Sequence, residues 1–143
     1  MTRLPDMITA LVTDQFIELE PLIISVKTVQ AGAIAIFSGD VRDNDGGKKV
    51  ESLTYEIHPS APKVIEEIAA RIVAKHDVIN AAIIHRYGAI PMGESAFVAV
   101  VSAVHRAPAM AACDELVTVV KAELPIWKYQ VFADGTSEWV NSA

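Results

Sequence analysis

The longest apolar runs in this 143-residue chain are only as long as β-strands, and this limits the folds open to it. The runs AGAIAIF and AFVAVV occupy residues 31–37 and 96–101. A helix needs about 18 consecutive apolar residues to span a bilayer, so neither run is long enough to cross a membrane. We therefore interpret both runs as strands and expect no membrane association.

Further strands are indicated by alternation and by turn signals. Leu53, Tyr55 and Ile57 alternate with polar residues, which is typical of a half-buried strand. Asp134–Gly135 is a turn signal inside a C-terminal hairpin. A segment near the N-terminus is ambiguous and favours a strand over a helix. The strand-like segments are residues 8–17, 50–57, 79–88 and the hairpin 128–140.

Three segments have the apolar spacing of helices. Residues 60–76 place aliphatic side chains on one face and charged ones on the other. Residues 106–124 form a longer helix that Pro125 ends. Residues 18–29 contain a short helix. The predicted apolar stripe of the long helix is Met110, Cys113, Val117, Val120 and Leu124. Because strands and helices mix without a regular βαβ rhythm, we predict one α+β domain over residues 1–143.

Composition narrows the classes of partner. The net charge is −6 and the pI is near 5.1, which argues against non-specific nucleic-acid binding. A single cysteine, Cys113, rules out an internal disulfide and indicates a reducing, cytoplasmic compartment. The first 16 residues lack the uninterrupted apolar stretch of a signal peptide. Apolar residues make up 52% of the chain, a surplus that a partner subunit could cover.

Metal and nucleophile chemistry receive little support from the motifs. The four histidines, at positions 58, 76, 85 and 105, have neither metal-ligand spacing nor a nearby cysteine, so we expect no metal and no cofactor. Spacing alone does not decide against a Ser-His-Asp or Cys-His site. Cys113, however, lies on the apolar stripe and is predicted to be a core residue. Gly46 and Gly47 predict a mobile loop at 43–49 rather than a phosphate-binding motif.

Basic side chains at the ends of predicted elements remain to be explained in an acidic chain. His105 and Arg106 precede the long helix, whose N-terminus attracts anions. His85 and Arg86 form a second such pair, which we interpret as structural. Arg42 follows a strand, and taken alone it is compatible with an ordinary loop residue.

Lys121 and Lys128 form the most informative pair. Lys121 lies on the flank of the apolar stripe, and Lys128 follows the apolar segment LPIW. Pro125 turns the chain between them, so their side chains are expected to converge. Paired lysines in one pocket can transfer protons or act as nucleophiles. The alternative is that both lysine stems only extend from the edge of the core.

These segments together resemble a known family. GAIAIFSGDVR, LTYEI, IIHRYGAIPMGE, VSAVHRAPA, VKAELPIWK and DGTSEWV occur in the order and spacing of the large, catalytic subunit of molybdopterin synthase. The resemblance covers residues 20–140 or so. It implies an α/β hammerhead fold with an additional antiparallel β subdomain, and a sulfurtransferase of molybdenum cofactor biosynthesis.

The resemblance also implies a substrate and partners. The substrate would be cyclic pyranopterin monophosphate, which receives two sulfurs to form the molybdopterin dithiolene. The donor would be the C-terminal thiocarboxylate of a small ubiquitin-like subunit ending in Gly-Gly. The assembly would be a heterotetramer around a central homodimer of large subunits.

Substrate-binding residues follow from matching positions. Asp40, Val41 and Arg42 match the substrate-binding segment of the family. His105 and Arg106 match a His-Arg pair that reaches the active site from the neighbouring large subunit. These residues are expected to hold the phosphate and the pterin.

The catalytic residues implied by the resemblance are the two lysines. Lys128 would act as general acid/base, and Lys121 would stabilise developing negative charge. Family members commonly continue this motif with a basic residue and Glu, whereas this chain has Tyr129 and Gln130. We expect these two to tune the binding of substrate or of the small subunit's tail. Two alternatives stay open: a catalytically inactive anion-binding or scaffold homologue, and an unrelated enzyme that uses a lysine Schiff base.

Overall fold

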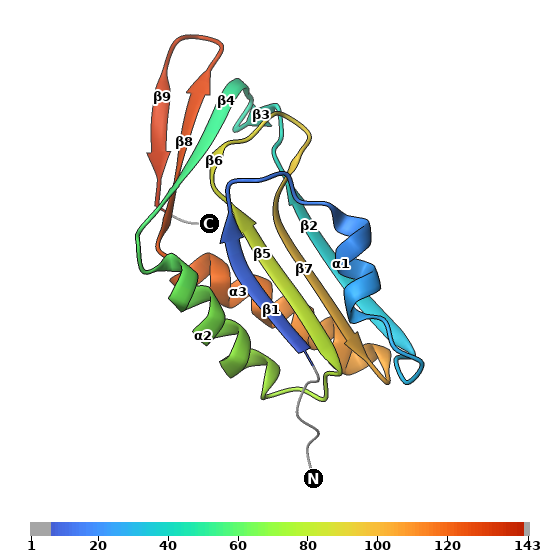
Figure 1. Cartoon of the computed structure of the whole chain (residues 1–143). Helices are drawn as coiled ribbons and strands as arrows, with labels where there is room; N and C mark the ends of the chain where they lie inside the picture. The colour runs from blue at the N-terminus through green and yellow to red at the C-terminus, as the bar shows by residue number, and fades with distance from the viewer. Residues whose placement is uncertain (1–6, 142–143) are drawn as a thin grey trace.

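The computed structural model describes residues 7–141, arranged as two β-sheets with helices packed on the larger one (Figure 1). Residues 1–6 lie outside the described range. They belong to the N-terminal segment in which the sequence predicts no signal peptide. The elements are β1 (Met7–Thr13), α1 (Leu19–Val26), β2 (Ala33–Asp40), β3 (Asn44–Asp45), β4 (Lys48–Ile57), α2 (Ala61–Val73), β5 (Asn80–Arg86), β6 (Gly88–Ala89), β7 (Ser95–Ala103), α3 (Arg106–Glu123), β8 (Ile126–Phe132) and β9 (Ser137–Val140). The α+β prediction is confirmed.

The first sheet has the strand order β1-β5-β7-β2 and is covered on both faces. Only β1 and β5 are parallel; the other pairs are antiparallel. Helices α2 and α3 pack on one face and α1 on the other (Figure 1). Alternate residues of β5 therefore enter different cores, with Ile83 facing α2 and α3 and Ile84 facing α1. This double coverage explains why β5 and β7 have nearly continuous apolar sequences.

The second sheet extends beyond the helices and is built on β4 and β8. It has the order β3-β4-β8-β9, and β6 also pairs with β4. In β4, Leu53 and Tyr55 are buried while Ser52 and Glu56 are exposed, as the alternation predicted. The C-terminal hairpin of β8 and β9 is also confirmed.

The predicted mobile loop at 43–49 is wrong, because these residues form a β-hairpin. Asn44 and Asp45 pair with Lys49 and Lys48 across a two-residue turn. Gly46 and Gly47 occupy that turn with φ of 59° and 83°. Two successive positive φ values favour a tight turn that continues the twist of the strands, and glycine adopts them without steric cost.

The long helix α3 is confirmed, but one residue of its predicted apolar stripe is wrong. Met110 is 63% exposed, whereas Ala109, Ala112 and Leu116 are fully buried. Small side chains at 109 and 112 let the helix lie close to β2 and β7, and this orientation turns Met110 outward. None of the helices within residues 7–141 combines the length and apolarity that crossing a bilayer requires.

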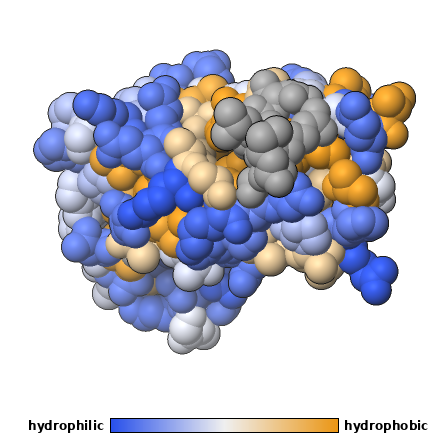
Figure 2. All heavy atoms as spheres, turned by 90° about the horizontal axis from the view of Figure 1, so that it is seen from below, coloured by the Kyte–Doolittle hydropathy of each residue, from blue (hydrophilic) through white to orange (hydrophobic). Residues whose placement is uncertain are grey.

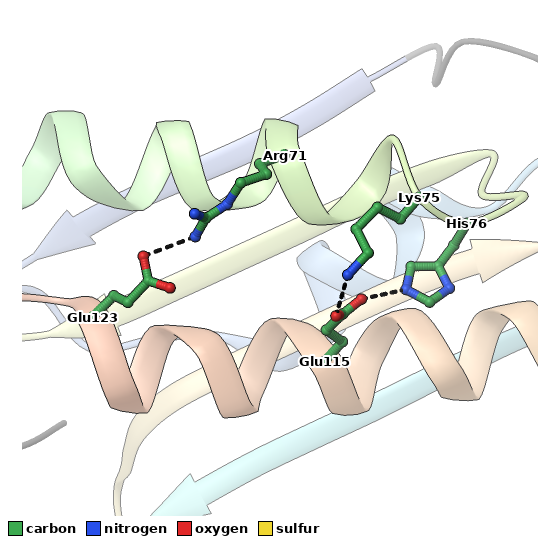
Figure 3. A network of polar contacts seen from close by, with 5 residues as sticks. All are labelled: Arg71, Lys75, His76, Glu115 and Glu123. Atoms are coloured by element: carbon green, nitrogen blue, oxygen red, sulfur yellow. Dashed lines mark hydrogen bonds and ion pairs between the residues drawn. The ribbon is translucent and has the colours of Figure 1, made fainter.

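Ion pairs on the outer side of α2 and α3 join the two helices (Figure 3). Arg71 donates to Glu123 at 2.8 Å, and Glu115 accepts hydrogen bonds from both Lys75 and His76. The two donors lower the pKa of Glu115, the Lys75 hydrogen bond being the larger cause. These pairs are partly exposed, so we assign them to helix alignment rather than to chemistry.

Candidate functional site

A cavity of about 170 Å³ lies where the two sheets meet. Its walls come from β2 and the residues just after it, from β4, β5 and β7, from the end of α3 and from β8. Arg42, Lys121 and Lys128 all line it. Three basic side chains from separate segments thus meet in one place in a chain of net charge −6.

The turn between α3 and β8 brings the two lysines together, as the sequence predicted. Lys121 lies in the last turn of α3, and the Pro125 carbonyl accepts a hydrogen bond from the His58 backbone N–H at 3.0 Å. Lys128 then pairs in register with Tyr55 of β4, which also lines the cavity. Lys128 is half-buried and Lys121 is exposed, so the cavity opens to solvent at the helix end.

The segment after β2 is fixed by backbone hydrogen bonds. The Val41 N–H donates to the Glu94 carbonyl at 3.0 Å, and the Gly93 N–H donates to the Val41 carbonyl at 2.8 Å. These bonds hold Arg42 at the rim. Val41 and Arg42 also line a larger hollow of about 550 Å³, so the two spaces adjoin.

Asp40 is the acidic residue of the cavity lining. Its Oδ1 accepts hydrogen bonds from Ser38 at 2.6 Å and from Ser95 at 3.0 Å. A register shift between Gly39 and Asp40 marks a bulge at the end of β2. The carboxylate is thus held by two hydroxyls, and the three basic side chains of the lining outnumber this one acidic side chain.

His85 also lines the cavity, a position that its interpretation as a structural residue did not include. Its ring stacks on Phe97 with centroids 5.0 Å apart and meets Tyr55 edge-on at 4.9 Å. The pKa of His85 is lowered to about 4, mainly by burial; the hydrogen bond to the Arg86 backbone opposes this shift and the positive charge of Lys121 adds to it. The sequence signal was a histidine directly after the apolar run Ala81–Ile84 of a strand.

Arg86 fits the structural interpretation. Its Nη1 donates to Glu94 Oε1 at 2.8 Å, and the side chain is largely buried. This pair ties β5 to the turn that also holds Val41, and so it supports the cavity from behind.

His105 and Arg106 do not reach this cavity within one chain. Both are exposed at the N-terminal end of α3. At 1.5 Å per residue, Arg106 lies roughly 22 Å along the helix axis from Lys121. The prediction that they act from a neighbouring subunit is compatible with this separation and stays a prediction.

Tyr129 and Gln130 lie outside the cavity lining. Tyr129 packs against Trp139 with ring centroids 4.8 Å apart. Gln130 is buried, and its Nε2 donates to Asp45 at 2.7 Å and to Glu138 at 3.0 Å. Both side chains are therefore engaged within the second sheet, and the structure does not bring them to the lysines.

Cys113 is buried, as predicted for a core residue. Burial raises the pKa of its thiol to about 11, with a smaller contribution from Asp114, so the reactive thiolate is scarce at neutral pH. Within residues 7–141 no three His, Cys, Asp or Glu side chains are grouped to hold a metal ion.

Comparisons with known proteins agree with this geometry. The family model described as MoaE protein matches residues 12–123. A molybdopterin synthase catalytic subunit from Arabidopsis thaliana is 41% identical over 111 residues, covering 77% of this chain and 56% of the relative. One from Pyrococcus abyssi is 39% identical over 118 residues, covering 82% and 80%. The chain spans little more than half the length of the plant relatives it matches.

Solved structures extend the likeness to the fold. Molybdopterin synthase from Staphylococcus aureus superposes with a TM-score of 0.84 at 30% identity, over 92% of this chain and 96% of that one. A complex of subunits 1 and 2 of the molybdopterin-converting factor from Helicobacter pylori contains a chain of the same fold, with a TM-score of 0.70 at 19% identity, covering 94% and 88%. The resemblance noted in the sequence is confirmed: this chain belongs to the MoaE protein family.

Proposed function

We propose that this chain is the catalytic subunit of a molybdopterin synthase. It transfers sulfur from the C-terminal thiocarboxylate of a small ubiquitin-like subunit to cyclic pyranopterin monophosphate and forms the dithiolene. The observation that carries this proposal is the meeting of Arg42, Lys121 and Lys128 in one cavity of a MoaE-family chain.

Charge favours these ligands. Both the substrate phosphate and the thiocarboxylate are anions, and an acidic protein would repel them without a local basic site. Arg42 offers a planar fork that suits a phosphate, and it stands where the cavity adjoins the larger hollow. That hollow is a route by which an extended tail can approach the lysines.

The chemistry needs proton transfer at two stages. In the first, the thiocarboxylate sulfur bonds to a substrate carbon while a carbon–oxygen bond at that carbon breaks. The oxygen leaves with the electron pair and is protonated, and the acyl group stays on the sulfur. In the second, water cleaves the acyl–sulfur bond, leaving sulfur on the substrate and releasing the tail as a carboxylate. Lys128 donates and accepts the protons of these stages, and Lys121 stabilises negative charge on the acyl oxygen.

A second copy of the chain completes the site in this proposal. Seen from below, hydrophobic surface gathers on the right, where Figure 1 draws α1 and β2 (Figure 2). Ile36 on the edge strand β2 is 46% exposed, and with Met110 it lines a hollow of about 290 Å³. Phe37 lines both this hollow and the basic cavity. A copy seated there would lie beside the cavity and bring its own His105 and Arg106 to it.

The proposed assembly also includes the small sulfur-carrier subunit. Its support is the Helicobacter pylori structure, which is a complex of two subunits and contains a chain of this fold. We place the reaction in the cytoplasm, where the buried thiol of Cys113 stays reduced.

Reconstitution tests the function directly. The purified chain is mixed with a thiocarboxylated small subunit and the cyclic pterin, and the dithiolene product is measured. We expect product with the wild-type chain and with the surface variant Lys63→Ala, but not with Lys128→Ala. Binding of both partners without product would instead identify an inactive scaffold homologue.

A further inference from the structure

His85 carries an unused hydrogen-bond acceptor at the wall of the basic cavity. The side chain is 1% exposed, and its Nε2 has no hydrogen-bond partner among residues 7–141. A buried polar atom left unpaired costs about 1–3 kcal/mol, so such atoms are rare in folded proteins. The proposed roles of Lys121 and Lys128 do not use this nitrogen.

The partner of the other ring nitrogen fixes the tautomer. His85 Nδ1 lies 2.8 Å from the Arg86 carbonyl oxygen, which can only accept, so Nδ1 carries the proton. Burial keeps the ring neutral, and Nε2 is then a lone-pair acceptor. It therefore needs a donor and cannot bind a phosphate or a carboxylate oxygen.

Lys121 is a hydrogen-bond donor that lines the same cavity as His85. Its positive charge also lowers the pKa of the His85 ring, although less than burial does. Lys121 has no ion pair or hydrogen bond from its side chain within the described part of the chain. The other lining groups that can donate are Tyr55, Arg42 and Lys128, while Asp40 is an acceptor held by two serines.

We propose that His85 is a positioning residue whose Nε2 accepts a hydrogen bond from the Lys121 ammonium and fixes that amine in the cavity. A neutral acceptor beside Lys121 orients the amine without adding a fourth positive charge to Arg42, Lys121 and Lys128. The effect on turnover rests on the proposed function, whereas the hydrogen bond itself does not.

Nitrogen NMR of the free chain tests the hydrogen bond independently of any reaction. In ¹⁵N-histidine-labelled protein at pH 7, we expect His85 to show a protonated Nδ1 and an unprotonated Nε2. The ¹⁵N chemical shift of His85 Nε2 should change in the Lys121→Met variant. It should remain unchanged in the Lys128→Met variant, which is the matched control. A protonated Nε2, or a shift that responds only to Lys128→Met, overturns the proposal.

Two substitutions at position 85 separate positioning from packing. Asn places an amide N–H near the Nδ1 position and removes the acceptor, whereas Gln can present an amide oxygen near the Nε2 position. We expect His85→Asn to lower turnover about 10-fold and His85→Gln to recover most of it, with similar thermal stability for the two. In a Lys121→Met background, His85→Asn should cost less than about 2-fold.

The outcomes distinguish the two proposals. Equal losses for Asn and Gln, or an unchanged loss in the Lys121→Met background, would show that the ring only fills space between Tyr55 and Phe97. If the wild-type chain makes no dithiolene, the proposed function fails, and the NMR shifts still decide the role of His85.

Discussion

The two ends of α3 both carry basic side chains, but their surroundings differ. At the C-terminal end, Lys121 shares a cavity with Lys128 and Arg42. At the N-terminal end, His105 and Arg106 are exposed and roughly 22 Å away. The same helix thus holds one cluster that is assembled within the chain and one that has no cavity of its own. This difference fits our proposal that the first cluster takes part in the chemistry and that the second serves the cavity of another copy.

Removal of Lys128 tests the assembled end and has the largest expected effect. Lys128→Ala should lower turnover about 1000-fold, because general acid–base groups contribute roughly 10²–10⁴. Binding of the small subunit should change far less. Lys128→Arg keeps the charge but holds its proton too tightly, so it should also be slow. Turnover near that of the Lys63→Ala control would remove Lys128 from the mechanism.

The buried histidine at the same end makes stability depend on pH. The pKa of His85 falls from 6.5 to about 4 on folding, mainly because of burial, so the unfolded chain binds the proton more tightly. Above pH 6.5 this histidine is neutral in both states and does not lower the free energy of unfolding. As the pH falls from 6.5 toward 4, the unfolded chain binds the proton first, and the free energy of unfolding decreases. The difference corresponds to roughly 3 kcal/mol in the free energy of unfolding.

Urea denaturation between pH 4 and 7.5 measures this effect. His85→Asn should flatten the pH dependence, whereas His105→Asn, at the exposed end of α3, should leave it in place. An unchanged slope in His85→Asn would mean that another group is responsible.

Arg106 tests whether the exposed end serves a second copy. Arg106→Ala should lower turnover about 30-fold by removing a charged hydrogen bond to an anionic ligand. Mixing equal amounts of Arg106→Ala and Lys128→Ala chains and allowing subunits to exchange should restore about a quarter of wild-type activity. Half of the dimers then hold one complete site of two. No recovery would mean that Arg106 acts within its own chain, and unchanged turnover of Arg106→Ala alone would mean that it does not act at all.

Local sequence patterns predicted those parts of the site that depend on neighbours along the chain. Apolar period located the strands and helices, and Pro125 between two lysines was enough to predict that they converge. The place of His85 in the cavity lining was not predicted, and Gln130, which was predicted to tune binding, lies outside that lining. Their surroundings come from strands distant in sequence, such as the pairing of β5 with β7 and of β4 with β8. The spacing of apolar residues alone does not predict which face of a buried strand borders a cavity.

Gly46 and Gly47 show the same limit at shorter range. A glycine pair is compatible with a mobile loop and with a tight hairpin turn. The flanking residues Asn44 and Asp45 have low strand propensity, so the only local feature that favours pairing is the Asp45–Gly46 turn signal. Gln130 of β8 donates to Asp45 and thereby ties β3 to the sheet. A contact across 85 residues therefore decides the structure of a seven-residue segment.

The smallest effect is expected for the ion pair between Arg71 and Glu123. Glu123 is close to Lys121 in sequence but does not line the basic cavity. Glu123 turns toward α2 and accepts from Arg71, away from the basic cavity (Figure 3). Both side chains are about half exposed, with relative exposures of 55% and 48%. Arg71→Gln should therefore lower the free energy of unfolding by less than about 1 kcal/mol and leave turnover within about 2-fold. Urea denaturation and the dithiolene assay measure the two quantities. A large loss of turnover with normal stability would show that the chemistry extends around the helix to α2, and the contrast between the two ends of α3 would no longer define the site.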